Sequence, residues 1–120
     1  MSHDDASSRL CRIRRLNDRL RVDLLDGEWV LTAGIAALDN ALALKVIHAV
    51  RTFAFPPDDG SPDEHDFGTV EIDGVHVVWK IDSYDLAKLH PSPDPADARK
   101  TRRVLTIMLA AENRGSGGRN

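Results

Sequence analysis

Cysteine is nearly absent from this sequence, which contains Cys11 alone among 120 residues. One cysteine cannot form an intramolecular disulfide, whereas small secreted domains are often rich in disulfides. The first eight residues are polar and acidic and lack the apolar segment of a signal peptide. No apolar run approaches the roughly 18 residues that a membrane helix needs. These absences predict a cytoplasmic protein that does not contact a membrane, with Cys11 as a small residue at the edge of the core.

Signatures of catalysis are also missing. The chain has no Gly-x-Ser-x-Gly nucleophile elbow. A metal-dependent nuclease pattern ending at Lys80 would need an acid two residues earlier, where Val78 stands. The glycine-rich residues 115–118 follow a predicted helix, so they offer no helix N-terminus to a phosphate. The sequence therefore favours a protein without a cofactor or an enzymatic activity, although it leaves the question of an enzyme open.

What the chain does have is the composition of one globular domain. Of its 120 residues, 42% are hydrophobic and 29% are charged, which is ordinary for a soluble protein. The length suits one domain and leaves no room for two ordinary ones. We therefore predict a single α+β domain over residues 1–114, followed by a flexible C-terminal tail over residues 115–120.

Hydrophobic periodicity predicts the elements of the first half of the chain. Apolar residues recur at helical spacing over residues 8–21, and a serine can cap that helix. The turn dipeptide Asp26-Gly27 precedes a short strand at 28–32, for which residues 22–25 are a candidate hairpin partner. An amphipathic helix is expected within 35–53, where His48 would be a partly buried structural histidine.

The clearest local signal lies in the second half of the chain. Asp73-Gly74 separates two alternating apolar runs, 69–72 and 75–81, and predicts a β-hairpin with a type I′ turn. Residues 94–97 have the order of an N-cap, a first-turn proline and a later carboxylate, so a helix is expected from there to about Asn113. The predicted fold is α+β, with a small, mostly antiparallel three-stranded sheet (one strand plus the hairpin) against about three helices.

The net charge of −3 hides a division along the chain. Residues 56–98 contain eleven acidic residues against two lysines, a net charge of −9. Residues 99–120 contain six basic residues against one acid, a net charge of +5. A second group of arginines lies between Arg9 and Arg21. These segments either attract a charged partner or pair with each other inside the fold.

The acidic part begins with a loop over residues 56–68 that is rich in proline and glycine. Loops of this length without secondary structure are usually functional or disordered. An acidic surface suits a basic protein partner, because arginine and lysine dominate nucleic-acid channels. The candidate partner-binding residues are Asp58, Asp59, Asp63, Glu64, Asp66 and Asp82.

Two alternatives remain open at this point. Hard oxygen ligands with imidazoles suggest a metal-binding module or a metal-dependent hydrolase, although the spacing matches neither a calcium loop nor a zinc site. Its candidate ligands are Glu64, His65, Asp66 and His76. Nucleic-acid binding by the first and last helices would need their arginines on one face, and the net negative charge counts against it. Those arginines are Arg12, Arg15, Arg19, Arg102 and Arg103.

Several motifs in order resemble those of the family called domain of unknown function 3768. They are residues 64–68 (EHDFG), 70–74 (VEIDG), 79–82 (WKID), 92–97 (SPDPAD) and 101–110 (TRRVLTIMLA). The resemblance carries over no catalytic residue. It implies an alphaproteobacterial protein that is often encoded on plasmids, integrative elements or phage, near antirestriction-type and plasmid-maintenance genes. Together with the acidic surface, it suggests a small non-catalytic interaction protein that inhibits a host defence nuclease, of the anti-CRISPR or antirestriction type.

Overall fold

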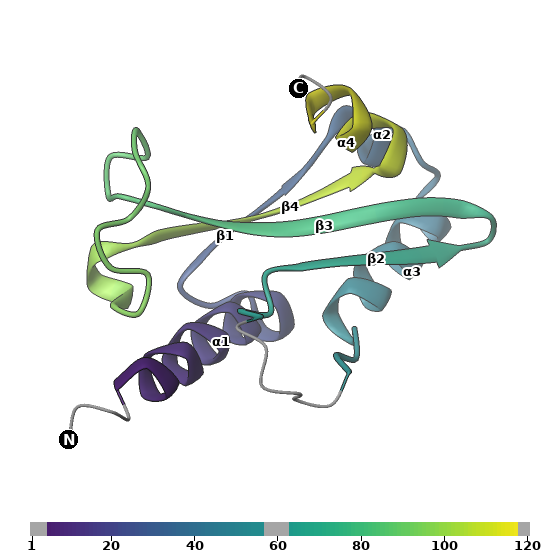
Figure 1. The fold of residues 1–120 in the computed structure, drawn as a ribbon. Helices are drawn as coiled ribbons and strands as arrows, with labels where there is room; N and C mark the ends of the chain where they lie inside the picture. The colour runs from purple at the N-terminus through teal and green to yellow at the C-terminus, as the bar shows by residue number, and fades with distance from the viewer. Residues whose placement is uncertain (1–4, 57–62, 118–120) are drawn as a thin grey trace.

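The computed structural model describes residues 5–56 and 63–117, and these form one mixed α+β fold (Figure 1). The elements in chain order are α1 (Asp5–Asp23), β1 (Gly27–Leu31), α2 (Ala33–Ala36), α3 (Asn40–Arg51), β2 (Phe67–Ile72), β3 (Val75–Tyr84), the 3₁₀ helix η2 (Ala98–Lys100), β4 (Arg102–Leu109) and α4 (Ala110–Gly117). The α+β class is confirmed. None of the helices in these two segments has the length and hydrophobicity that a membrane span requires.

The strands form one sheet in the order β1-β4-β3-β2. β1 runs parallel to β4, with Trp29 opposite Leu105, while β3 is antiparallel to both β4 and β2. The prediction of three strands was therefore one too few, and the sheet is mixed. The missing strand is β4, which lies between β1 and β3 and joins the first strand to the hairpin.

The helix that the sequence predicted from residue 94 to Asn113 is wrong over most of its length, where the chain forms η2 and β4, and only its last residues, from Ala110, are helical, in α4. The capping chemistry is real but local: Asp94 Oδ1 accepts from the backbone N of Ala96 at 3.1 Å, and Asp97 Oδ1 accepts from that of Arg99 at 2.9 Å. These bonds form a turn and the short η2, and the chain then extends. Both faces of β4 are largely buried, so its apolar run has no strand-like alternation and resembles a buried helix.

The β2–β3 hairpin is confirmed with its predicted turn. Asp73 and Gly74 have φ angles of 52° and 83°, and two positive φ values in succession are what a type I′ turn needs. Along β3, Val77, Trp79 and Ile81 are buried on the inner face, as their alternation predicts. Gly74 tolerates this backbone conformation because it has no Cβ.

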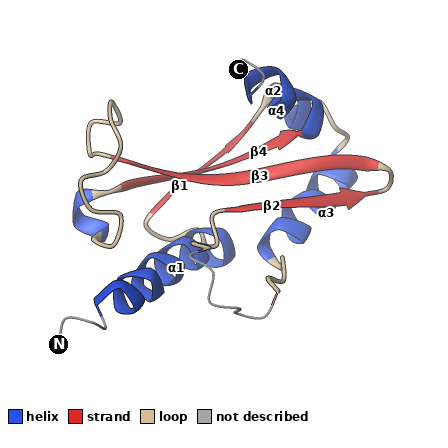
Figure 2. Ribbon diagram, in the orientation of Figure 1, coloured by secondary structure: helices blue, strands red, loops and turns tan. Residues whose placement is uncertain are grey.

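The core lies between the sheet and the two longer helices, α1 and α3, which are on the same side of it (Figure 2). Trp79 is at its centre with no exposed surface and makes edge-to-face contacts with Phe53 and Phe55, whose ring centroids lie 5.4 and 6.0 Å away. Leu20 of α1 and Val50 of α3 complete the packing against this ring. Nearly all side chains of this core come from alternating or helical apolar positions in the sequence.

Several smaller expectations were wrong. Residues 22–25 are not a strand, because they complete α1 and the loop after it, where Leu24 has a φ of 59°. The helix expected within 35–53 is two helices, since Asp39 caps α3 by accepting from the backbone N of Leu42 at 2.8 Å. Cys11 and His48 are both exposed. α4 continues to Gly117 and so includes residues 115–117 of the predicted tail.

Candidate functional site

α1 is held between two acidic segments of the chain. On one side, Asn17 Nδ2 donates to the carbonyl of Glu64 at 2.9 Å, and His65 Nδ1 lies 3.1 Å from a carboxylate oxygen of Asp18. On the other side, Arg9 pairs with Asp94 at 3.3 Å. Of these contacts, the exposed Arg9–Asp94 pair joins a basic residue of α1 to the acidic part of the chain.

Three of the predicted partner-binding residues come together at the open end of the β2–β3 hairpin. Asp63, Asp66 and Asp82, called here the acidic cluster, lie close enough for their charges to interact. Burial raises the pKa of Asp66, and the negative charges of Asp63 and Asp82 raise it further. A hydrogen bond from the Ile81 backbone N to the Asp66 carbonyl, 2.8 Å long, fixes the segment against β3. The cluster thus places three acidic residues at this end of the sheet, two of them before β2 and one in β3.

Basic residues lie beside this cluster. Arg14 Nε donates to the Asp63 carbonyl at 2.5 Å, and Lys80 Nζ lies 3.4 Å from a carboxylate oxygen of Asp82. The sequence predicted that the Lys80 and Asp82 side chains would point outward together, since residues two apart share a face of a strand. Both side chains are about 40% exposed, at 42% and 37%, so solvent screens the pair. Lys80 therefore offsets only part of the negative charge of the acidic cluster.

The remaining predicted acidic residues do not belong to the cluster. Asp58 and Asp59 lie outside the described residues. The charge of Glu64 affects a buried side chain, that of Arg103. Burial lowers the pKa of the Arg103 guanidinium, whereas the negative charges of Asp26 and Glu64 raise it. Glu64 thereby helps to keep a buried arginine charged.

The histidines named as metal-ligand candidates lie far apart in the fold. His65 stacks on Phe55, with ring centroids 3.9 Å apart and an angle of 6° between the planes. His76 is next to the turn at the other end of the hairpin, opposite Glu71. Across the described ranges 5–56 and 63–117, no three His, Cys, Asp or Glu side chains are grouped as a metal ion would need. The structure does not bring the four candidate ligands together.

The five candidate arginines for nucleic acid divide between two regions. Arg102 and Arg103 do not open a last helix as expected, because they begin β4. Arg102 is exposed, whereas Arg103 is only 1% exposed and donates from Nε to Asn17 Oδ1 at 2.8 Å. Arg103 is therefore a structural residue that ties β4 to α1.

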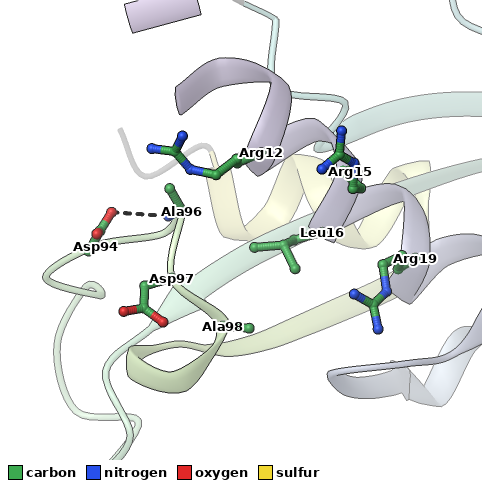
Figure 3. A pocket seen from close by; sticks show the side chains of 8 residues that line it. All are labelled: Arg12, Arg15, Leu16, Arg19, Asp94, Ala96, Asp97 and Ala98. Carbon is green, nitrogen blue, oxygen red and sulfur yellow. Dashed lines mark hydrogen bonds between the residues drawn. The ribbon is translucent and has the colours of Figure 1, made fainter. Parts of the chain in front are cut away.

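Arg12, Arg15 and Arg19 line a cleft of about 410 Å³ between α1 and residues 94–98, called here the arginine cleft (Figure 3). Its remaining lining residues are Leu16, Asp94, Ala96, Asp97 and Ala98. The sequence indicated the three arginines but not the other wall of the cleft, because residues 94–98 have the pattern of a helix start. The pairing of Asp and Pro with turn-forming neighbours is the signal that marks this segment as a loop.

The comparison with protein families gives the class of this chain. Residues 31–112 match the family described as "Protein of unknown function (DUF3768)", which confirms the resemblance seen in the sequence motifs. The chain therefore belongs to this family. The comparisons with curated proteins and with solved structures found no match.

Proposed function

We propose that this protein is a small non-catalytic interaction protein that binds a basic surface of a partner protein through its acidic cluster. The observation that carries the proposal is the placement of three acidic residues on adjoining backbone: the Asp66 carbonyl accepts from the Ile81 backbone N, next to Asp82, and Asp63 Oδ1 accepts from the His65 backbone N. Burial raises the pKa of Asp66 and the charges of Asp63 and Asp82 raise it further, so ionising this carboxyl costs free energy in the free protein. An arginine or lysine of a partner placed at the cluster would offset this repulsion, so the free protein is arranged to gain from a cationic partner.

The partner class that best fits an acidic surface is a protein with a nucleic-acid channel. Such channels concentrate arginine and lysine to bind phosphates, and an acidic protein surface competes for the same positions. The setting that the family resemblance implies, on mobile elements, makes a cytoplasmic host defence nuclease the first partner to test. In this proposal the protein inhibits the nuclease by occupying its channel.

The test removes the charge of the cluster and leaves its shape. In the variant D63N/D66N/D82N each carboxylate becomes an amide of nearly the same size. The new amide at position 63 retains an acceptor for the His65 backbone N, which lies 2.8 Å from Asp63 Oδ1. The matched control, D23N/E71Q/D73N, removes the same number of charges elsewhere on the surface. Asparagine suits the positive φ of position 73.

Tagged wild type, the cluster variant and the control are used for affinity capture from the native host, and captured proteins are quantified by mass spectrometry. We expect wild type and control to retain a nucleic-acid-binding partner that the cluster variant loses. Heparin, a polyanion, should displace that partner. The affinity of the partner for this protein should rise with pH as Asp66 ionises. Equal retention by all three proteins, or a partner that heparin does not displace, would contradict the proposal.

A further inference from the structure

The arginine cleft contains two cations that have no partner among the described residues. Arg19 is paired with Asp26 at 3.0 Å. Arg12 and Arg15 are exposed, and within the described part of the chain neither forms an ion pair or a hydrogen bond through its side chain. Both guanidinium groups are thus available to an anion from solution, and arginine forks match phosphate oxygens in geometry.

The opposite wall of the cleft is held in place by buried side chains. Thr101 Oγ1 lies 2.9 Å from the carbonyl oxygens of both Asp94 and Asp97. Arg103 donates to the carbonyl of Pro95 and, at 2.8 Å, to Asn17 Oδ1 on α1. Thr101 and Arg103 are 5% and 1% exposed. The turn at 94–97 is therefore anchored relative to α1, so the cleft between them is preformed.

The two walls differ in charge. Arg12 and Arg15 stand on α1, while Asp97 and Asp94, which pairs with Arg9 at 3.3 Å, stand on the turn across from them (Figure 3). Hydrogen bonds from the backbone N and the side chain of Arg99 lower the pKa of Asp97, whose Oδ1 lies 3.5 Å from Arg99 Nε. Leu16, Ala96 and Ala98 supply apolar surface between the charged groups. A ligand that fits has an anion at one end, a hydrogen-bond donor at the other and a flat or apolar middle.

We propose that the arginine cleft binds a small phosphorylated ligand of the nucleoside monophosphate class, with its phosphate on Arg12 and Arg15 and an amino group of its base toward Asp97. The cleft volume of about 410 Å³ is in the range of small-molecule sites, about 300–1,000 Å³. A nucleic-acid strand fits less well, because its further phosphates would meet Asp94 and Asp97. This site goes beyond the proposed function and uses none of the residues of the acidic cluster.

The full chain is titrated with AMP by calorimetry and by amide NMR shifts. Inosine monophosphate, adenosine, inorganic phosphate and a ten-nucleotide single strand serve as comparison probes. AMP should bind more tightly than inosine monophosphate, which lacks the amino group, and than adenosine, which lacks the phosphate. Shifts should be confined to α1 and residues 94–98. Binding of the oligonucleotide without AMP would overturn the proposal in favour of a nucleic-acid surface, and the absence of AMP binding at millimolar concentration would overturn it outright.

Variants then locate the site. R12Q/R15Q should weaken AMP binding at least about tenfold, since hydrogen bonds to charged groups are the strong ones. K100Q/R102Q removes two exposed positive charges from outside the cleft and should leave the affinity unchanged. D97N, which keeps the acceptor for the Arg99 backbone, should weaken AMP and leave inorganic phosphate unaffected. Equal loss in the first two variants would show that only net charge matters and would refute the assigned site.

Discussion

Replacing Arg103 by methionine should destabilise the fold and release the 94–97 turn from α1. Arg103 is 1% exposed and joins Asn17 of α1 to Pro95 of the turn. Methionine has a similar length but cannot donate a hydrogen bond, so the Asn17 and Pro95 oxygens would lose this donor. The neighbouring Arg102 is exposed and provides a matched control on the same strand.

The expected loss of unfolding free energy in R103M follows from two opposing contributions. Hydrogen bonds from a charged donor contribute about 1.5–3 kcal/mol each, so the two bonds of Arg103 contribute about 3–6 kcal/mol. Burial of the guanidinium, whose Nη1 has no partner among the described residues, offsets part of this gain. We expect R103M to lower the free energy of unfolding by about 2–4 kcal/mol and R102M by less than about 0.5 kcal/mol. A domain of this size has about 6–18 kcal/mol of stability, so R103M should still fold.

The assay is urea unfolding followed by tryptophan fluorescence, combined with amide exchange at Asp97. In wild type the Asp97 backbone N donates to the carbonyl of Asp94 at 3.0 Å, and this bond should open more often in R103M. A loss below about 1 kcal/mol, with Asp97 exchange unchanged, would refute the structural role given to Arg103.

Two further predictions concern stability. G68A should cost about 1–3 kcal/mol and shift the fluorescence of Trp79, because a Cβ at Gly68 would lie 2.5 Å from Trp79 Nε1; an unchanged urea midpoint would contradict this. E112Q should lower the melting temperature at pH 7, since Glu112 accepts from Thr32 Oγ1 at 2.6 Å and the Leu109 backbone N at 2.8 Å. These bonds lower the pKa of Glu112 in the folded protein. The stability that they add is therefore fully present above the ordinary pKa of a glutamate in the unfolded chain. It is lost as the pH falls through the lower pKa of the folded state. The difference between variant and wild type, followed by circular dichroism, should therefore shrink as the pH falls below the ordinary pKa of glutamate, and a constant difference would count against the assignment.

The elements that the sequence predicted well are those decided by local interactions. The Asp73-Gly74 turn needs two positive φ angles, and few residue pairs supply them. The apolar spacing of α1 likewise sets its buried side. The prediction missed β4 for a physical reason. This strand is buried on both faces between β1 and β3, so its residues show no period-2 alternation. Its strand character depends on neighbours that are distant in sequence.

The same distinction holds for the two surfaces. The hairpin register places Phe67 opposite Lys80, so a correctly predicted turn is enough to bring Asp66 near Asp82. The arginine cleft forms only because α1 lies beside residues 94–98, which come much later in the chain. That contact depends on Arg103, which the sequence presents as one more exposed base. Only the three-dimensional fold separates it from Arg102.

Binding of a basic partner by the acidic cluster can be measured with purified proteins. The affinity of a captured partner for wild type, D63N/D66N/D82N and D23N/E71Q/D73N is determined by calorimetry at low and physiological salt. We expect the cluster variant to bind at least about tenfold more weakly than the other two, and added salt to narrow the difference in affinity. Equal affinities of the cluster variant and wild type would show that the acidic cluster is not the binding surface.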